Sequence, residues 1–209
     1  SKDPDRTIGV IFATESSVEV RNTEIYGAGI KVYSSKLGLS KVKVSECKYI
    51  GIHGENAEIK IVGSVFEGNG IDIFSPQVRV KDCVVNIKNS KVMNGNGSGI
   101  WGDNCEILLD KSTVSGNYYY GIFIDSSSKL TMTSSRIVEN GNSEEDYPQL
   151  KVVTSNAKIK AGRILNGVNN SGIWLEDTAF LEADDLKVTG HYFHGIVLRD
   201  DSEILMRGG

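Results

Sequence analysis

The sequence predicts an all-β fold, a single-stranded parallel β-helix of about nine turns with three short strands in each turn. The dipeptide Gly-Ile recurs, alternating apolar residues follow it, and no stretch of helical length has a 3.6-residue period. Gly-Ile starts at seven glycines, mostly 19 to 29 residues apart: Gly29, Gly51, Gly70, Gly99, Gly121, Gly172 and Gly195. A gap of 51 residues after Gly121 hides a degenerate copy around Leu150. A repeat near twenty residues indicates one unit stacked many times.

The first strand of each unit follows the glycine. In Gly121-Ile-Phe-Ile-Asp125, the isoleucines alternate with other residues. A two-residue period indicates a strand with one buried face, so the residues after each inward isoleucine point to solvent.

A second strand begins eight or nine residues after the glycine with another alternating apolar pair, such as Leu130 and Met132. In the unit that opens at Gly70, this pair is Val78 and Val80. A third short strand ends in residues such as Asn140, which tolerate the positive φ of a tight corner. One unit cannot bury its inner face alone, so each strand is expected to pair with its copy about 4.8 Å along the axis.

The repeats predict one solenoid domain over residues 1–209, with irregular segments near 84–98 and 140–149. Neither end shows an amphipathic capping helix. Because exposed strand edges invite association, we expect a fragment of a longer protein, with further β-helix turns or another chain at the uncapped ends.

Charge and hydropathy limit the classes of partner that the chain is expected to bind. The net charge is −4 with interspersed signs, which argues against nucleic acid and anionic membranes, and no apolar stretch is long enough to span a membrane. Cys47 and Cys83 are assigned to one inward column two turns apart, about 9–10 Å, beyond disulfide reach. They and Cys105 are therefore expected to be buried free thiols.

The repeated pattern of Gly-Ile, a Ser/Asp/Asn turn, a second alternating pair and a terminal Asn extends from roughly Ile8 to Met206. It resembles the right-handed parallel β-helices of the pectate-lyase-like superfamily. That resemblance implies a right-handed solenoid and a secreted or cell-surface location. The superfamily includes polysaccharide lyases, glycosidases, epimerases, tailspikes, adhesins and copper-delivery proteins, so fold alone does not choose a function.

The outward positions of the first strands gather aromatic residues on one face. Flat aromatic rings stack on sugar rings while carboxylates and amides bind hydroxyl groups, so this face predicts a polysaccharide or glycan ligand. Aromatic stacking between turns, or protein–protein contact, would explain the same row. The candidate ligand-binding residues are Trp101, Phe123, Trp174, Tyr119, His53, His194 and Asp72.

Carboxylates on the same face are candidates for cation binding or acid catalysis. Asp103 and Asp125 are predicted in the same slot of adjacent turns, about 5 Å apart. Such a pair either binds a cation such as Ca²⁺ or raises the pKa of one carboxyl group, and the spacing also fits a retaining glycosidase. Alternatively, both carboxylates are simply solvated. With Glu176, they are the leading catalytic candidates if the chain is an enzyme; no cofactor other than Ca²⁺ is indicated.

Complete catalytic motifs are missing. Polygalacturonase-like members carry acids and a Gly-His-Gly before these strands, whereas this chain offers only His194-Gly195-Ile196. Outward Lys31, Lys151 and Arg199 are scattered, and only His191 and His194 are close enough in sequence to share a metal. We therefore rank a glycan-binding extracellular or surface domain first, a structural or adhesin-type rod second, and a polysaccharide lyase, glycosidase or epimerase third.

Overall fold

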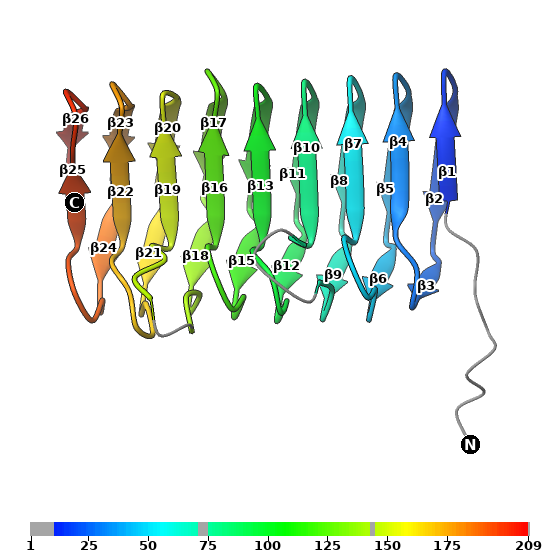
Figure 1. Ribbon diagram of the computed structural model, residues 1–209, viewed down its shortest axis with the longest axis horizontal. Helices are drawn as coiled ribbons and strands as arrows, with labels where there is room; N and C mark the ends of the chain where they lie inside the picture. Colours follow the sequence, from blue (N-terminus) through cyan, green and yellow to red (C-terminus); the bar gives the residue numbers. More distant parts are fainter. Residues whose placement is uncertain (1–10, 71–74, 143–144, 209) are drawn as a thin grey trace.

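The computed structural model describes residues 11–70, 75–142 and 145–208. Within them the chain forms 26 strands and no helix, stacked as turns along one axis from β1 to β26 (Figure 1). The three sheets hold nine, nine and eight parallel strands, so eight complete turns are followed by a ninth with two strands. The predicted β-helix of about nine turns with three strands per turn is confirmed.

The first sheet carries the candidate face. Its strands are β1 (Ile11–Thr14), β4 (Ile30–Tyr33), β7 (Ile52–Glu55), β10 (Val78–Lys81), β13 (Ile100–Asp103), β16 (Ile122–Asp125), β19 (Leu150–Val153), β22 (Ile173–Glu176) and β25 (Ile196–Leu198).

The second sheet runs behind the first in Figure 1. Its strands are β2 (Ser17–Arg21), β5 (Lys36–Ser40), β8 (Glu58–Val62), β11 (Val84–Lys88), β14 (Glu106–Asp110), β17 (Lys129–Thr133), β20 (Asn156–Lys160), β23 (Phe180–Asp184) and β26 (Glu203–Arg207).

Three-residue strands form the third sheet. They are β3 (Glu24–Tyr26), β6 (Lys43–Ser45), β9 (Val65–Glu67), β12 (Lys91–Met93), β15 (Thr113–Ser115), β18 (Arg136–Val138), β21 (Arg163–Leu165) and β24 (Lys187–Thr189).

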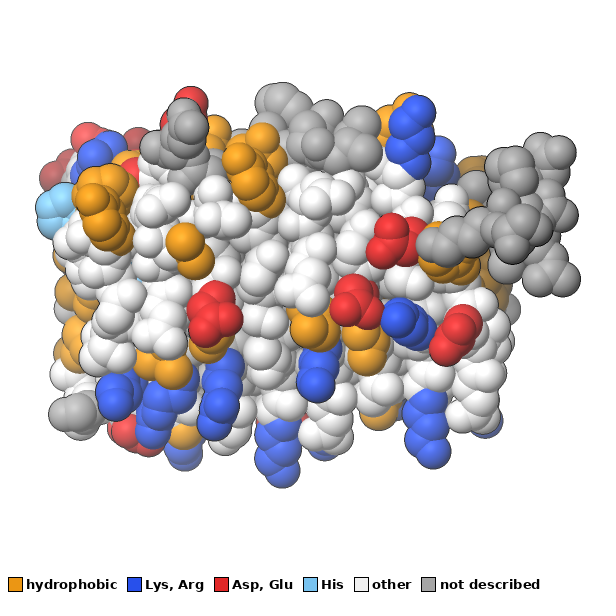
Figure 2. Space-filling view, turned by 90° about the horizontal axis from the view of Figure 1, so that it is seen from below, with side chains coloured by type: hydrophobic (Ala, Val, Ile, Leu, Met, Phe, Trp, Pro, Cys, Tyr) orange, Lys and Arg blue, Asp and Glu red, His pale blue; other side chains and the backbone are white. Residues whose placement is uncertain are grey.

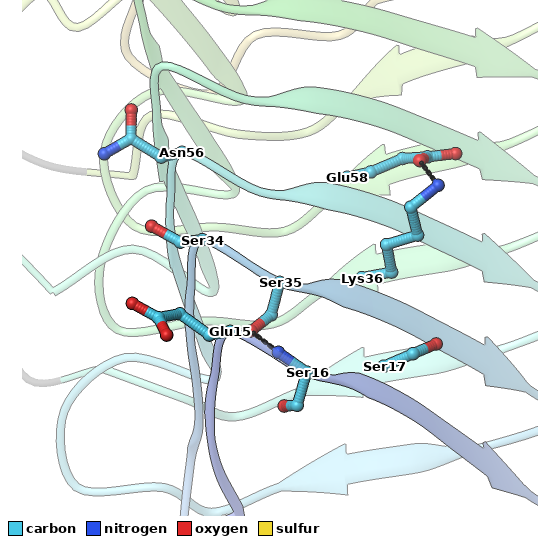
Figure 3. A pocket seen from close by; sticks show the side chains of 8 residues that line it. All are labelled: Glu15, Ser16, Ser17, Ser34, Ser35, Lys36, Asn56 and Glu58. Atoms are coloured by element: carbon cyan, nitrogen blue, oxygen red, sulfur yellow. Dashed lines mark hydrogen bonds and ion pairs between the residues drawn. The ribbon is translucent and has the colours of Figure 1, made fainter.

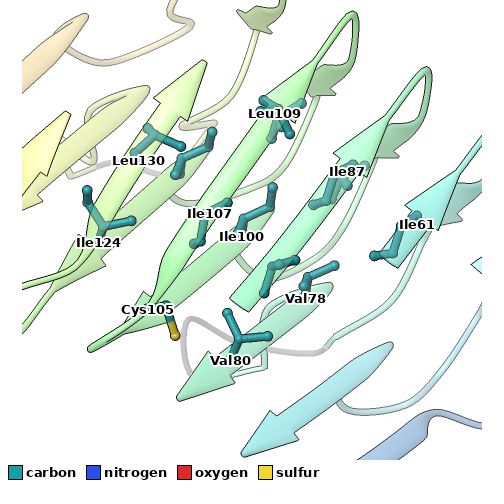
Figure 4. Close-up of a cluster of buried hydrophobic side chains, with 14 of the residues drawn as sticks. Ile61, Val78, Val80, Ile87, Ile100, Cys105, Ile107, Leu109, Ile124 and Leu130 are labelled. Atoms are coloured by element: carbon teal, nitrogen blue, oxygen red, sulfur yellow. The ribbon is translucent and has the colours of Figure 1, made fainter. Parts of the chain in front are cut away.

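The core is a continuous column of aliphatic side chains between the three sheets (Figure 4). Ile100, Ile107 and Val114 come from the three strands of one turn, and all are fully buried. Each stacks on its register partner in the next turn, as Ile100 does on Ile122. Burial of these methyl-rich faces, at about 25 cal/mol per Å² of apolar surface, supplies the main driving force for stacking.

Single left-handed residues make the corners. Asn104, Lys111 and Gly116, at the three corners of one turn, have φ values of 50°, 48° and 62°. A residue with positive φ bends the chain sharply within one or two positions, so that each strand leads into the next sheet, and the sequence pattern predicted such corners.

The turn that opens at Gly70 corrects the predicted register. Val78–Lys81 is the first-sheet strand β10, paired with β7 and β13, and does not belong to the second sheet. The irregular segment predicted near 84–98 was wrong, because β11 and β12 occupy most of it; the extra length lies between β9 and β10. The sequence carries two alternating stretches after Gly70, and the second pairs in register. Ile71, Asp72 and Phe74 lie outside the described residues.

A buried amide ladder lines the third corner, where the third sheet returns to the first. Asn69 Nδ2 donates to Gln77 Oε1 at 2.7 Å, and Gln77 Nε2 donates to Asn117 Oδ1 at 2.9 Å. Asn117 Nδ2 donates to Asn140 Oδ1 at 2.8 Å, and Asn140 Nδ2 to Gln149 Oε1 at 2.6 Å. These amides are fully buried, so the ladder satisfies polar groups that would otherwise destabilise the corner.

Gln77 and Gln149 hold the glycine position that precedes the first strand in other turns. Glycine at position 95 leaves room for the Gln77 side chain, because a Cβ on Gly95 would lie 2.7 Å from Gln77 Cγ. The glutamine thus fills the ladder place that an asparagine fills in other turns. Both glutamines follow a proline and end the two long connections between strands, residues 68–77 and 139–149. The second connection coincides with the segment 140–149 that was expected to be irregular.

The cysteines are free and buried, as predicted, but their register is different. Cys83 and Cys105 are neighbours at the first corner, which joins the first sheet to the second. There the Cys83 amide donates to Cys105 Sγ at 3.4 Å. Cys47 lies at the third corner, where its amide donates to Asn69 Oδ1. Shifting Val78–Lys81 into the first sheet moves Cys83 out of the Cys47 column.

Candidate functional site

Two outward rows run along the first sheet in register. The row nearer the third corner reads Phe12, Lys31, His53, Arg79, Trp101, Phe123, Lys151, Trp174 and Val197. The other row reads Thr14, Tyr33, Glu55, Lys81, Asp103, Asp125 and Val153, and then Glu176. Trp101, Phe123 and Trp174 therefore share one row as predicted, with Arg79 standing where Asp72 was expected.

Six aromatic rings form a connected aromatic cluster over turns of β13 to β19. Phe123 joins it to the strands: its ring lies 4.7 Å from Trp101 and 5.3 Å from Tyr120, between centroids. Tyr147 lies 5.0 Å from both Tyr119 and Tyr120. The aromatic cluster consists of Trp101, Tyr118, Tyr119, Tyr120, Phe123 and Tyr147.

The cluster is not a flat platform. The Trp101 and Phe123 rings meet at 72°, and Tyr147 meets its two partners at 86° and 87°. Edge-to-face packing lets each ring present its positive edge to a neighbour's negative face. Tyr120 and Phe123 are stacked at 28°, so a ligand at this cluster would contact mainly ring edges and the 41% exposed Tyr118.

The connection 139–149 holds Tyr147 in place. The Asp146 carboxylate accepts hydrogen bonds from the Ser171 amide at 2.7 Å and the Ser171 hydroxyl at 2.9 Å. Asn170 Nδ2 donates to the Tyr147 carbonyl at 2.7 Å. These bonds tie the connection to the following turn, so Tyr147 covers the rings from a fixed position.

Tyr120 and Tyr147 both remain protonated at neutral pH. Burial, with Tyr147 and the Glu176 carboxylate nearby, raises the pKa of Tyr120 to about 12. The hydrogen bond to Glu145 and burial raise the pKa of Tyr147 to about 12. Neither phenol therefore serves as a base, and the Tyr147 hydroxyl already donates to Glu145 Oε2 at 2.7 Å.

A second group, the Trp174 cluster, consists of Lys151, Trp174, Glu176 and Arg199. Lys151 Nζ and Arg199 Cζ lie 5.4 and 4.4 Å from the Trp174 ring centroid. Glu176 binds Lys151 Nζ at 2.9 Å and Arg199 at 3.6 Å. Lys151 and Arg199, which were expected to be scattered, thus meet around one indole. Glu176 is held as an ion-paired carboxylate, with its side chain only 16% exposed.

The candidate catalytic carboxylates are only partly brought together. Asp103 and Asp125 are register neighbours, as predicted. Asp125 Oδ1 accepts hydrogen bonds from the Ser126 amide and from Thr154 Oγ1, at 2.5 and 2.9 Å. Glu176 stands two turns beyond Asp125, separated from it by Val153. A catalytic role for these residues stays a prediction.

The predicted calcium site has only two carboxylates. In the described parts of the chain, no group of three or more His, Cys, Asp or Glu could hold a metal ion. Ca²⁺ takes six to eight oxygen ligands, so Asp103 and Asp125 alone do not build its site.

The histidines take separate roles. His53 Nε2 lies 2.8 Å from Glu55 Oε1 on the first-sheet face. His191 is turned into the ladder, where Nδ1 accepts from the Gly167 amide and Nε2 donates to the Ile164 carbonyl. Exposed His194 contributes its backbone amide to Ser171 Oγ. A metal site shared by His191 and His194 is wrong, because both ring nitrogens of His191 are occupied.

A polar hollow of about 650 Å³ lies apart from these clusters, at the first corner of the N-terminal turns (Figure 3). Lys36 and Glu58 form an ion pair at its wall, with Nζ 2.9 Å from Oε2, and Ser35 Oγ accepts from the Ser16 amide. It contains no aromatic residue among its lining residues, and we assign it no function.

Sequence reasoning missed Arg79 and Tyr147. Arg79 lies 5.3 Å from the Trp101 ring centroid, a contact that depends on the corrected β10 register. The Pro-Gln pairs at Pro76-Gln77 and Pro148-Gln149 were the available signal, because each marks where a long connection rejoins the first sheet. The packing of Tyr147 depends on side-chain contacts between turns and has no local signal.

Comparison with known proteins identifies the family of the chain and solved structures of similar fold. None of the curated proteins compared with the chain matches it. A double mutant of the periplasmic alginate epimerase AlgG has TM-score 0.65 and 12% identity, covering 91% of this chain and 51% of that one. A pectate lyase has TM-score 0.54 and 13% identity, covering 88% and 55%. The chain thus spans about half the length of these structures, and at such identity they show the fold alone.

A family model described as a right handed beta helix region matches residues 76–208, which is more than half of the chain. The match supplies the handedness that sequence periodicity left open, and it agrees with the three parallel sheets. No helix in the described residues is long and apolar enough to cross a membrane. The chain belongs to the right-handed β-helix family.

Proposed function

We propose that this chain binds a polysaccharide across the outer side of its first sheet, over the aromatic cluster and the Trp174 cluster. One observation carries the proposal: five consecutive turns place Arg79, Trp101, Phe123, Lys151 and Trp174 in one in-register row. Four intervals of about 4.8 Å make this row about 19 Å long, which suits several sugar units of an extended chain.

The chemistry of the row fits a ligand with many hydroxyl groups. Aromatic edges and half-buried ring surface contact the C–H groups of sugars, while Arg, Lys and phenol groups donate hydrogen bonds to sugar oxygens. Asp103 supplies a carboxylate acceptor in the neighbouring row. The epimerase and lyase of similar fold act on alginate and pectate by their names, which supports a polysaccharide ligand and a secreted, periplasmic or cell-surface location.

The test is a glycan-array and titration comparison of the wild-type chain with Trp101→Ala/Trp174→Ala, with and without Ca²⁺. We expect the double variant to lose about tenfold or more in affinity, which corresponds to about 1.4 kcal/mol. Phe180→Ala is the matched control, because Phe180 is a half-buried outward aromatic on the second sheet. Equal binding by all three proteins would contradict the proposal.

A structural rod is the second candidate, favoured by the way the rings and cations satisfy one another. Arg199 and Lys151 both contact the Trp174 ring. If the row only stabilises stacking, Trp101→Ala/Trp174→Ala lowers Tm by several degrees while the wild-type protein binds no glycan. Any glycan that binds should also be incubated and analysed for cleavage or epimerisation, with Asp103→Asn and Glu176→Gln as the variants that test a catalytic role.

A further inference from the structure

The corner between the second and third sheets carries a long row of cations. Three positions per turn form it: the last residue of the second-sheet strand, the corner residue, and the first residue of the third-sheet strand. We call this the basic edge; its cations are Arg21, Lys41, Lys43, Lys88, Lys91, Lys111, Arg136, Lys160, Arg163, Lys187 and Arg207.

The basic edge has a charge opposite to that of the whole chain. It holds eleven of the 23 Lys and Arg but only four of the 27 Asp and Glu, in a chain of net charge −4. These four acids are Glu24, Asp110, Asp184 and Asp185. Figure 2 shows Lys and Arg side chains lined up along the lower long edge of the molecule.

Some of these cations pair with nearby carboxylates. Lys43 binds Glu67 at 3.0 Å, and Lys88 binds Asp110 at 3.4 Å. Arg163 lies 3.3 Å from Asp185. Exposed pairs of this kind are screened by solvent and contribute little to stability, so they do not lock the edge against a ligand.

Five successive turns each retain an unpaired cation. Among the described residues, these five side chains make no ion pair or hydrogen bond, and all five are exposed: Lys91, Lys111, Arg136, Lys160 and Lys187. Their turns are consecutive in the third sheet, from β12 through β15, β18 and β21 to β24. The edge thus presents about one free positive charge for every 4.8 Å of axis.

The composition of the edge selects among polyanions. Single-stranded nucleic acid is bound by aromatic side chains on which bases stack, and none of the three positions carries an aromatic residue in any described turn. Duplex DNA winds away from a straight row of charges and places phosphates about 3.4 Å apart on each strand. A membrane surface requires a broad patch with apolar anchors, whereas this is a narrow ridge.

An acidic polysaccharide matches the row. It carries one carboxylate or sulfate per sugar or disaccharide, and a pyranose ring linked through its opposite ends is comparable in length to the rise of one turn. We propose that the basic edge is a second polysaccharide contact, which takes an acidic chain laid along the solenoid axis. It rests on the proposed function only in taking polysaccharide as the ligand class; it lies on a different corner from the aromatic cluster.

The test uses the whole chain and measures affinity for polygalacturonate, alginate and chondroitin sulfate, with dextran as the neutral polymer. The edge variant is Lys111→Gln/Arg136→Gln/Lys160→Gln. We expect its Kd for at least one acidic polymer to rise about tenfold or more, with a shallower dependence on salt, because fewer counterions are released. Binding to dextran should not change.

The matched control is Lys60→Gln/Lys129→Gln/Lys158→Gln, which removes the same charge from the outward face of the second sheet. Its affinity for acidic polymers should change less than about twofold, because its charges lie off the edge. Three results overturn the inference: no acidic polymer binds the wild type at low salt, the edge variant binds like the wild type, or both variants lose affinity equally.

A single-stranded DNA oligonucleotide of matched charge completes the test. If it binds as tightly as the acidic polysaccharides, the edge attracts polyanions in general and the polysaccharide assignment is overturned. Failure of the proposed function has another signature: Trp101→Ala/Trp174→Ala then binds every polysaccharide like the wild type, while the edge variant alone loses the acidic ones.

Discussion

His191 takes the place in the buried ladder that Asn117 takes three turns earlier. The Gly95 amide donates to Asn117 Oδ1, and the Gly167 amide donates in the same way to His191 Nδ1. Because Nδ1 accepts and Nε2 donates to the Ile164 carbonyl, the ladder requires the neutral imidazole. An ionisable residue therefore stands where other turns use an amide.

This arrangement predicts acid sensitivity. Burial lowers the pKa of His191 below its ordinary value of 6.5, although the Ile164 carbonyl opposes the shift. The unfolded chain then takes up the proton at higher pH than the folded chain. The contribution of His191 to stability is complete above pH 6.5 and is lost as pH falls from there to the folded pKa.

The measurement is Tm between pH 5 and 8 for the wild type and His191→Asn. The variant should lose less stability on acidification, because asparagine supplies an acceptor and a donor without titrating. His194→Asn is the control, since His194 is exposed, and it should follow the wild type. Parallel pH profiles for wild type and His191→Asn would show that ladder protonation does not matter.

Ala161 tests the cost of left-handed corners. It has φ of 51°, where a Cβ contacts the following carbonyl oxygen and costs about 1 kcal/mol. Ala161→Gly should raise the free energy of unfolding by up to about 1 kcal/mol, measured by urea denaturation. The buried strand residue Ala157 is the counterpart, and Ala157→Gly should lower it by about 0.5–1 kcal/mol or more. Destabilisation by Ala161→Gly would contradict the strain argument.

Long connections leave the solenoid without breaking its ladder because glutamine and glycine exchange places. Gln77 reaches Asn69 and Asn117, and it also donates to the Met93 carbonyl at 2.6 Å. Gln149 similarly reaches Asn140 and the Leu165 carbonyl. Each long connection thus ends in a glutamine that restores the hydrogen bonds of the ladder, which the inserted residues would otherwise interrupt.

Gln77→Gly should therefore lower stability by about 2–3 kcal/mol, because buried amides lose their partners. Adding Gly95→Asn should recover part of this loss, since other turns combine a glycine before the strand with a ladder asparagine. A double-mutant cycle by urea denaturation measures the recovery. Additive destabilisation by the two changes would show that the exchange is not a compensation.

The same glutamines explain how far the sequence predicted the fold. Where glycine precedes isoleucine, as at Gly99 and Gly121, the predicted strands β13 and β16 and their outward residues are in register. At Gln77 that signal is absent, and Gly70-Ile71 imitates it. The prediction therefore placed the first strand of this turn at Gly70-Ile71, ahead of its position at Val78–Lys81. Trp101, Phe123 and Trp174 followed from two-residue periodicity alone. The ring angles, the Tyr147 contacts and the pairing of Lys151 with Glu176 could not, because they depend on side-chain packing between turns.

At the scale of the whole molecule, each turn is stabilised chiefly by its two neighbours, so stability should depend on position along the axis. Ile107 and Ile204 occupy the same second-sheet column, but Ile107 is fully buried near the centre, whereas Ile204 in β26 is only partly buried. In the last turn, Leu198, Leu205 and Met206 are 43%, 41% and 44% exposed. Truncation of isoleucine to alanine should therefore lower stability by different amounts at these two positions.

Ile107→Ala should cost about 3–4 kcal/mol, because it leaves a cavity between turns that pack on both sides. Ile204→Ala should cost about 1 kcal/mol, since its side chain already contacts solvent. Hydrogen exchange measures both effects without assuming two-state unfolding, which long repeat arrays violate. Ile107→Ala should speed exchange in β11, β14 and β17 together, while Ile204→Ala should affect only β23 and β26. If Ile204→Ala instead speeds exchange throughout the solenoid, the turns unfold as one unit and the nearest-neighbour description fails.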